Sequence, residues 1–492
     1  MVITAFGWVY LPLLAGVAML RAAWLPALLL VAAALHAPAI AIIGAKPYGG
    51  GTGISPWFVT ALVACLHLAV LVSRQRRIVP GESVATRRLM LGWSVFFALS
   101  IASSFVLPWL FAGVDVHALG HRRGFGIAPT PLQWSASNLV QAVNSAMLWL
   151  VMLYMLQMAR IPGITRRLAL GTAGAVAAAL LLALWQRAQT IEILPTLQWF
   201  QLSLNPSYVQ RIGGGVDGIA RIPWPFPEPS YASVFFASVY AGGLALFLFT
   251  RRVAAGAALA LAGLAGTANS LGVAGIVAAA FATIVLLAFA TFQLARRGPN
   301  IESSLRTKFR GLILVLIAAI VCGFIVDRIP MFERFSIQTL AARLLEPRLA
   351  GVEPSGASRA ASHVVAMSVL RDTFGLGAGL GSNRASSYIA SLLSNVGVLP
   401  TLLLLGLLGY QIRLLARVSR NDPVAVFVLA GLPTMLIGVT LAIPDLNWPA
   451  LWVWILVAFC LNARAETEGD GMAKVEVPLP AMLSTEFEET PG

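Results

Sequence analysis

Residues 211–233 read RIGGGVDGIARIPWPFPEPSYAS and lie between two long apolar stretches of the chain. Four prolines alternate in the second half of this segment, at Pro223, Pro225, Pro227 and Pro229. Because proline is excluded from helix interiors and central strands, the segment is predicted to be a stiff, extended arm. A helix is expected to begin near Tyr231 with Ser230 as its N-cap, so that the first backbone N–H groups of the helix face the arm.

The composition indicates a membrane protein. Of its 492 residues, 58% are hydrophobic and 11% are charged, whereas about a quarter of a soluble protein is charged. Many apolar runs approach or exceed the roughly 20 residues that span a bilayer as a helix. We therefore predict an all-α polytopic membrane protein with about 12–14 transmembrane helices. The predicted helices cover about residues 3–20, 23–44, 55–73, 89–113, 135–159, 168–186, 231–250, 253–268, 271–295, 309–326, 386–410, 424–443 and 449–463.

The net charge of +14 is interpreted as a topology signal. Most arginines lie in short interhelical loops, an arrangement that argues against nucleic-acid binding. The positive-inside rule assigns those loops to the cytoplasm, which leaves the N-terminus outside and the C-terminus inside. Cys65, Cys322 and Cys460 all lie within apolar runs, so neither a disulfide framework nor a metal site is expected, and no cofactor is predicted.

The chain is expected to form one transmembrane domain over residues 1–464. Two long loops, at about 187–230 and 327–385, would lie on the outer side of the membrane. Residues 465–492 are acidic and show no apolar periodicity, so we expect a disordered cytoplasmic tail.

The first outer loop begins with TIEILPTLQWFQLSL, residues 190–204. Its apolar positions suggest an amphipathic segment at the membrane interface, with Trp199 at the level of the lipid headgroups. Such a segment would suit the entry of a lipid substrate. A loop helix packed on the protein itself is the alternative.

The second outer loop carries a helical pattern over residues 358–372, with Arg359 in the first turn and His363 one turn later. The sequence FGLGAGLGSNRASS follows, and its four alternating glycines would let backbone N–H groups approach an anion closely. No Gly-Lys-Ser/Thr closes this run, so it is not a nucleotide-binding P-loop. Asn383 and Arg384 are expected to open the next membrane helix.

Three motifs follow one another along these loops. They are PEPS at Pro227–Ser230, ANSLG at Ala268–Gly272, and Arg359 followed by Gly375–Asn383 and by NVG at Asn395–Gly397. Together they resemble the O-antigen polymerase and ligase superfamily of bacterial envelope glycosyltransferases, the Wzy and WaaL proteins. The resemblance covers about residues 205–410.

The resemblance implies a GT-C fold and an active site on the periplasmic face of the bacterial inner membrane. It implies an O-antigen or exopolysaccharide polymerase, which moves the growing glycan from undecaprenyl diphosphate to the non-reducing end of a lipid-linked repeat unit. The expected partners are undecaprenyl-diphosphate-linked oligosaccharides, membrane lipid, and a chain-length-regulating or export protein. The outer loops contain neither an Asp-x-Asp pair nor a His/Asp cluster, which favours a metal-independent transferase.

A departing diphosphate gathers negative charge, which fixed arginines would stabilise. We assign this role to Arg221 and Arg359, with Arg384 and Arg211 as further diphosphate-binding candidates. Glu228 is the candidate general base for the acceptor hydroxyl; capping its own helix or pairing with Arg221 is the alternative.

Four further residues are candidates for substrate contacts. Asn269 and Asn383 could hold sugar hydroxyls, Ser230 lies at the helix entrance, and His363 is an alternative base. Asp445 and Asn447 in the motif PDLNWP either line the same cavity or form a turn.

Two other classes of protein remain open. A ligase would move a finished glycan to another acceptor, but His363 is the one histidine of the second loop that could match the histidine expected of ligases. A flippase for the lipid-linked oligosaccharide should show internal repeats and charges near the middle of the bilayer. The charges here lie almost entirely outside the predicted helices, which favours the polymerase.

Overall fold

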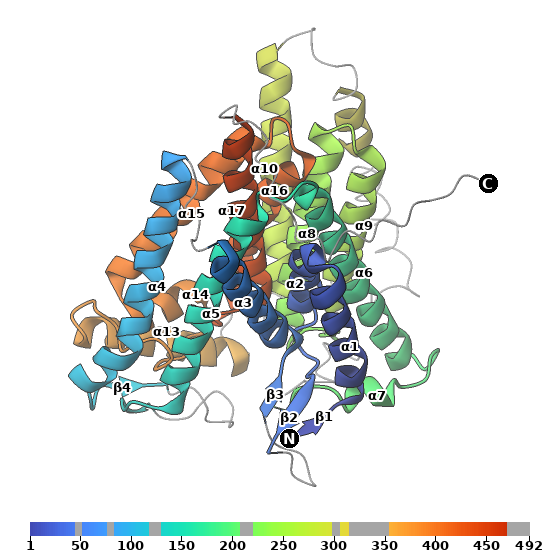
Figure 1. The fold of residues 1–492 in the computed structure, drawn as a ribbon. Helices are drawn as coiled ribbons and strands as arrows, with labels where there is room; N and C mark the ends of the chain where they lie inside the picture. Colours follow the sequence, from blue (N-terminus) through green and yellow to red (C-terminus); the bar gives the residue numbers. More distant parts are fainter. Residues whose placement is uncertain are drawn as a thin grey trace.

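The computed structural model describes residues 1–44, 52–75, 83–117, 129–206, 220–297, 306–313 and 354–469. Within these ranges the chain is mostly helical, and nine helices are long and apolar enough to cross a membrane (Figure 1). These are α3 Pro56–Gln75, α4 Val84–Leu110, α5 Ala136–Met158, α6 Ile164–Thr190, α8 Pro229–Phe249, α9 Val253–Ser270, α10 Val273–Arg297, α15 Val398–Val418 and α16 Pro423–Ala442. The chain is therefore a multi-pass membrane protein.

Other helices complete the bundle. α1, Ala5–Leu20, and α2, Leu25–Ala34, are joined by the short 3-10 turn Ala22–Trp24 and are bent by 119° at that break, so they form at most one broken span. The remaining helices are α7 Gln198–Gln201, α13 Pro354–Asp372, α14 Tyr388–Val396 and α17 Pro449–Gly469. The predicted helix at 309–326 lies mostly outside the described residues, of which 306–313 are helical.

The predicted helix over 23–44 is wrong in its second half. α2 ends at Ala34, and the chain then runs through a buried irregular segment into β2, Ala41–Ile43. β2 is the middle strand of an antiparallel sheet with β1, Val2–Ile3, and β3, Thr52–Ile54. Pro38 disfavours continuation of the helix.

The predicted helix over 386–410 is in fact two helices. α14 ends at Val396 and α15 begins at Val398, because Gly397 adopts φ +83° between them. By contrast, the break expected around Asn269 is confirmed. α9 ends at Ser270, Leu271 adopts φ +49°, and α10 begins at Val273.

α8 is the central helix of the bundle, and most of its residues are buried. It packs closely against α9 because glycines replace larger side chains at the contact. A Cβ atom on Gly263 would lie 2.3 Å from the backbone nitrogen of Tyr240, and one on Gly243 would lie 2.3 Å from that of Ala260. Small residues that let backbones approach are the usual basis of helix packing in membranes.

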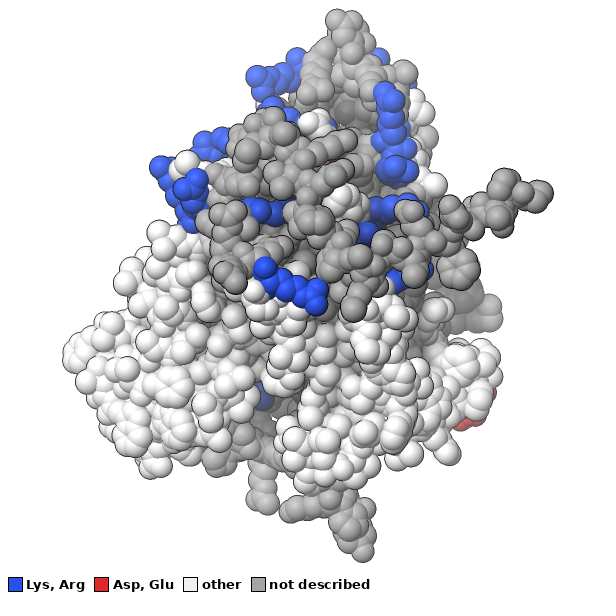
Figure 2. Space-filling view, viewed as in Figure 1, with Lys and Arg blue, Asp and Glu red and all other residues white. Residues whose placement is uncertain are grey.

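The two ends of the bundle differ in charge (Figure 2). Lys and Arg gather at one end, which we call the basic end. The exposed arginines there include Arg74, Arg87, Arg251, Arg296 and Arg420. The opposite end carries the three-stranded sheet, α7, α13, and the pair β4, Asp115–Val116, and β5, Thr130–Pro131 (Figure 1).

Candidate functional site

The proline-rich arm is described from Ala220 onward and is neither helix nor strand, but it is not extended throughout, because the N–H of Phe226 closes a turn on the carbonyl of Pro223 at 2.8 Å. The arm is packed into the protein. Ile222, Trp224 and Phe226 are all buried. The backbone N–H of Trp224 donates to Gln186 Oε1 at 3.0 Å, and its ring lies 4.7 Å from that of Phe200. Arg221 is half-buried on this segment, whereas Arg211 lies outside the described residues.

The arm also contacts the segment that follows α2. The backbone N–H of Ala37 donates to the carbonyl of Pro225 at 2.7 Å. His36, one residue earlier, is buried with its ring 6.1 Å from that of Tyr231. Burial lowers the pKa of His36 to about 3, so its imidazole is neutral at ordinary pH. No motif or spacing in the sequence singles out this histidine.

The expected N-cap at Ser230 is wrong, because the N-cap of α8 lies two residues earlier. Glu228 is the N-cap, with extended backbone at φ −140° and ψ 155°, and Pro229 is the first helical residue. Proline suits this position because its missing N–H would have no partner within the helix. The Glu228 side chain is exposed and accepts a 3.4 Å hydrogen bond from Ser230 Oγ. A carboxylate at this helix end is electrostatically favourable.

The break between α9 and α10 lies directly against the first turn of α8. A Cβ atom on Gly272 would lie 2.0 Å from Ser233 Oγ and 2.9 Å from the carbonyl oxygen of Pro229. Only glycine fits there. The PEPS and ANSLG motifs, separated by about forty residues in sequence, are therefore neighbours in the fold.

Asn269 at this break is held by Arg187, a residue that the sequence analysis did not select. Arg187 donates from Nε to Asn269 Oδ1 at 2.7 Å and from Nη2 to the Asn269 carbonyl at 2.8 Å. Asn269 Nδ2 donates to the carbonyl of Ala183 at 3.0 Å. Both ends of the Asn269 amide are thus bonded within the protein, which gives this residue a positioning role.

The glycine-rich loop adopts the backbone that its sequence predicts, but its N–H groups point inward. Gly375, Gly377, Gly379 and Gly381 all have positive φ, between +80° and +98°. Every backbone N–H from Gly375 to Arg384 donates to an acceptor of the protein itself. The expectation that this loop offers N–H groups to an anion is therefore wrong.

Asn395 is the main acceptor for these groups. Its Oδ1 accepts from the backbone nitrogens of Gly381, Ser382 and Asn383 at 3.0–3.1 Å, and so takes the place that an anion would have. Its Nδ2 donates to the carbonyls of Asn383 and Ser391, both at 2.7 Å. The NVG motif thus shapes the loop.

Asn383 and Arg384 differ in their exposure. Asn383 is 2% exposed; its Oδ1 accepts from the backbone N–H of His117 at 2.9 Å and its Nδ2 donates to Ser394 Oγ at 2.9 Å. That amide is engaged inside the protein. Arg384 is exposed and lies close enough to Asp445 to favour its ionised form.

Asp445 lies on the turn between α16 and α17, and its Oδ1 accepts from the backbone N–H of Asn447 at 3.2 Å. Burial raises the pKa of Asp445, and the Asn447 N–H and Arg384 oppose part of that rise. The PDLNWP motif therefore forms a turn and also presents a carboxyl group beside a cation.

α13 begins at Pro354, which puts Arg359 in its second turn rather than its first. Arg359 is half-buried and His363 is exposed. The hydroxyls of Ser362 and Ser386 are hydrogen-bonded, which joins α13 to the chain just after Arg384. Arg359 and Arg384 consequently come from two segments that are fastened together.

The turn between α16 and α17 connects the two halves of the site. Trp448 packs edge-on against Tyr231 in the first turn of α8, with ring centroids 5.3 Å apart. The backbone carbonyl of Leu446 accepts a hydrogen bond from the Tyr388 hydroxyl of α14 at 3.4 Å.

We call this region, from the start of α8 across the turn to Arg384 and α13, the outer site. Glu228 and the buried Ser230 belong to the α8 end of this region, and Arg359 and Arg384 belong to the segments at its other end.

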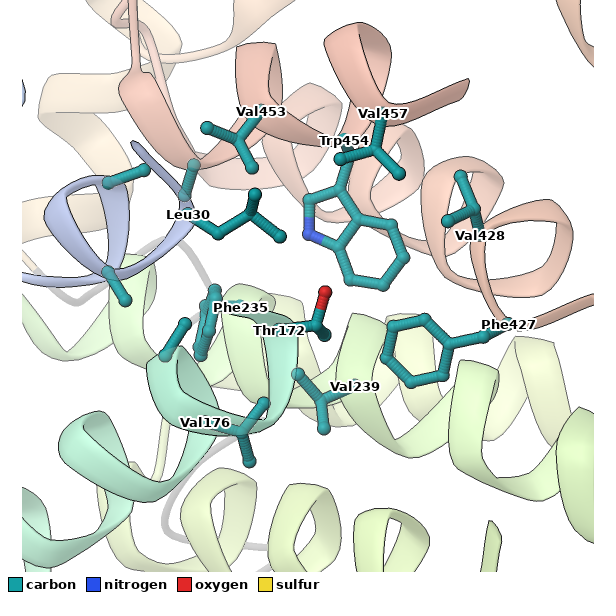
Figure 3. Close-up of a pocket in the computed structure, with 14 residues that line it drawn as sticks. Leu30, Thr172, Val176, Phe235, Val239, Phe427, Val428, Val453, Trp454 and Val457 are labelled. Carbon is teal, nitrogen blue, oxygen red and sulfur yellow. The ribbon is translucent and has the colours of Figure 1, made fainter. Parts of the chain in front are cut away.

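A cavity deeper in the bundle is apolar (Figure 3). Side chains of α2, α6, α8, α16 and α17 line it, and Thr172 is its one polar side chain. It has no group able to activate a hydroxyl or bind a phosphate. Within the described ranges, no cluster of three His, Cys, Asp or Glu side chains has the arrangement of a metal site.

Comparison with known proteins leaves the site to be interpreted on its own chemistry. No protein-family model matches the chain, and no curated protein matches its sequence.

Proposed function

We propose that the protein is a polysaccharide polymerase of the O-antigen or exopolysaccharide type. It would transfer a growing glycan from undecaprenyl diphosphate to the non-reducing end of a lipid-linked repeat unit. The observation that carries this proposal is the outer site, where the turn between α16 and α17 packs on the first turn of α8 through Trp448 and Tyr231 and holds Asp445 near Arg384. The motif resemblance to the Wzy and WaaL superfamily, with its GT-C fold, supports it.

The proposed reaction is a displacement at an anomeric carbon. The acceptor hydroxyl oxygen forms a bond to that carbon, the bond from the carbon to the diphosphate oxygen breaks, and the hydroxyl proton passes to the base. Glu228 is the proposed base because its carboxylate is exposed at the site and hydrogen-bonded by Ser230. Lipid diphosphate leaves with the bonding electron pair.

The leaving diphosphate requires cationic stabilisation. Arg359 and Arg221 are the proposed donors, with Arg384 and Arg211 as further candidates, and each well-placed donor is worth about 3 kcal/mol of transition-state stabilisation. His363 is exposed on α13 and is proposed to contact the glycan. Asn269 and Asn383 are not proposed to bind substrate, because their side-chain amides are hydrogen-bonded within the protein.

The proposed location is the bacterial inner membrane, with the outer site facing the periplasm. The separation of the basic end from the outer site supports this orientation (Figure 2). A chain-length-regulating or export protein is the proposed partner.

The test is transfer by the purified protein. Undecaprenyl-diphosphate-linked repeat unit is incubated with the protein in detergent, without metal or nucleotide, and products are separated on a gel. A product ladder that is lost in Arg359→Ala and strongly reduced in Glu228→Gln is expected. One discrete product formed only with a second acceptor would mean a ligase, and no transfer under any condition would overturn the proposal.

A further inference from the structure

Arg187 is a half-buried cation in the last turn of α6, three residues before the helix ends at Thr190. Among the described residues its guanidinium bonds only Asn269, through Nε and Nη2, and no carboxylate lies within ion-pair distance. A guanidinium has five N–H donors in a rigid plane, so three of them have no acceptor within the part of the chain that the structure describes. A fixed cation with spare donors near the membrane surface attracts an anion strongly.

Capping of α9 accounts for part of this arrangement. The Asn269 carbonyl belongs to the last turn of α9, where a cation is favourable. Capping needs one donor, however, and Arg187 is also oriented through the Asn269 side chain, which is itself fixed by Ala183. The pair holds the guanidinium in one plane, which suits bidentate binding of phosphate oxygens.

Two contacts connect the neighbours of Arg187 with the arm and with the α8 end of the outer site. Gln186, the preceding residue, accepts the backbone N–H of Trp224 on the arm that carries Arg221. Asn269 belongs to the break that packs on the first turn of α8. Trp185 donates its indole N–H to Pro195, and tryptophan at this end of a membrane helix is typical of the headgroup level.

We propose that Arg187 binds a phosphate group of a polyprenyl diphosphate lipid, and that Asn269 positions its guanidinium for this. The identity of the lipid rests on the function proposed above. The shared chemistry is a diphosphate anion, which could also come from solution.

The first experiment measures binding of undecaprenyl diphosphate to the full-length protein in phosphatidylcholine nanodiscs. Arg187→Gln is expected to weaken binding by about tenfold or more, since a hydrogen bond to a charged group is lost. Arg167→Gln is the matched control, because Arg167 lies at the other end of α6 and donates to the carbonyl of Pro162 at 3.1 Å. Equal affinity of Arg187→Gln and the unaltered protein would overturn the proposal.

Asn269→Asp separates binding from capping. It keeps an acceptor for Arg187 and adds a negative charge that offsets the cation, while the bond that Asn269 Nδ2 donates to the Ala183 carbonyl is lost. The proposal expects weaker binding of undecaprenyl diphosphate with the Arg187 contact retained. Unchanged affinity of Asn269→Asp for undecaprenyl diphosphate would overturn the proposal. This variant therefore tests the proposal even if Arg187→Gln does not fold.

Competition identifies the source of the anion. Inorganic diphosphate competing with undecaprenyl diphosphate, while undecaprenol does not, would support recognition of the diphosphate. Equal competition by phosphatidylglycerol vesicles, or no binding of undecaprenyl diphosphate at all, would overturn it. Binding that depends on Arg187 without any glycan transfer would leave this inference intact and remove the polymerase. Glycan transfer by the unaltered protein, together with unchanged lipid binding in Arg187→Gln, would support the polymerase and overturn the inference about Arg187.

Discussion

Asn395 is the residue on which the glycine-rich loop depends most directly. Its Oδ1 accepts three buried backbone N–H groups, and no water can replace it without entering the core of the loop. Asn395→Ala is therefore expected to destabilise the protein by more than about 3 kcal/mol, since each buried, unpaired N–H costs about 1–3 kcal/mol. Thermal unfolding of the purified protein in detergent measures this loss.

Two variants check the origin of that effect. Asn395→Asp keeps the acceptor and loses the two donated bonds, so its unfolding temperature should lie between those of Asn395→Ala and the unaltered protein. Asn421→Ala, at an exposed turn of the basic end, should leave the unfolding temperature unchanged. Equal stability of Asn395→Ala and Asn421→Ala would show that the loop does not rely on this amide.

Asp445 predicts a pH dependence of stability. Burial raises its pKa in the folded protein, whereas an unfolded aspartate has a pKa of about 3.9. The folded state therefore binds more protons between these two values, and stability from this group is present at low pH and lost as the pH rises through the raised pKa. Asp445→Asn should gain stability relative to the unaltered protein as the pH increases.

Unfolding temperatures from about pH 4 to about pH 8 test this expectation. Asn at this position keeps the acceptor for the Asn447 N–H, so the turn itself is preserved. Asp372→Asn, which removes a solvent-exposed carboxyl group on α13, is the control for loss of one acid. A difference between Asp445→Asn and the unaltered protein that is constant with pH would contradict the assignment.

At the scale of elements, the separation of α14 from α15 depends on Gly397. Its φ of +83° and ψ of −177° belong to a backbone region that is almost exclusive to glycine, and a Cβ atom would lie 2.4 Å from the carbonyl oxygen of Leu376. Gly397→Ala is expected to lower the free energy of unfolding by about 3 kcal/mol or more. Gly406→Ala, on α15 with open space around its Cβ position, should be neutral or stabilise by up to about 1 kcal/mol.

Yields and unfolding temperatures of these two variants in detergent give the comparison. If Gly397→Ala were as stable as Gly406→Ala, α14 and α15 could form one continuous helix, as the apolar pattern alone suggested. The same result would remove the reason for the inward course of the glycine-rich loop, because Gly397 packs on it.

Apolar length was a sufficient signal for most of the long helices, since each must match the thickness of the bilayer. It failed where a tertiary contact ended a helix early. Residues after Ala34 are apolar enough for a helix, but they pair with the arm and with a strand. The prolines of the arm correctly excluded a helix or a strand, because the ring restricts each residue locally, but the turn between Pro223 and Phe226 was not predicted.

The outer site was harder to foresee, because its residues are defined by partners distant in sequence. The sequence suggested Asn383 and Asn269 as sugar-binding residues. Asn383 is instead hydrogen-bonded to residues 11 and 266 positions away in the sequence, and Asn269 to residues 82 and 86 positions away. Arg187 showed no motif at all, and only its contact with Asn269 singles it out. Glu228 and Arg384 are exposed, and their roles in the reaction stay predictions.

At the scale of the whole molecule, the opposed ends of the bundle predict its orientation in the membrane. The turn at Arg420 belongs to the basic end, and Thr196 lies exposed beside α7 at the opposite end (Figure 1). In a chain without Cys65, Cys322 and Cys460, Thr196→Cys should react with a membrane-impermeant maleimide in intact spheroplasts. Asn421→Cys, next to Arg420, should react only after the membrane is permeabilised, because basic loops are retained in the cytoplasm. The reverse labelling pattern would mean that the outer site faces the cytoplasm, and this would contradict the proposed transfer of glycan at the periplasmic face.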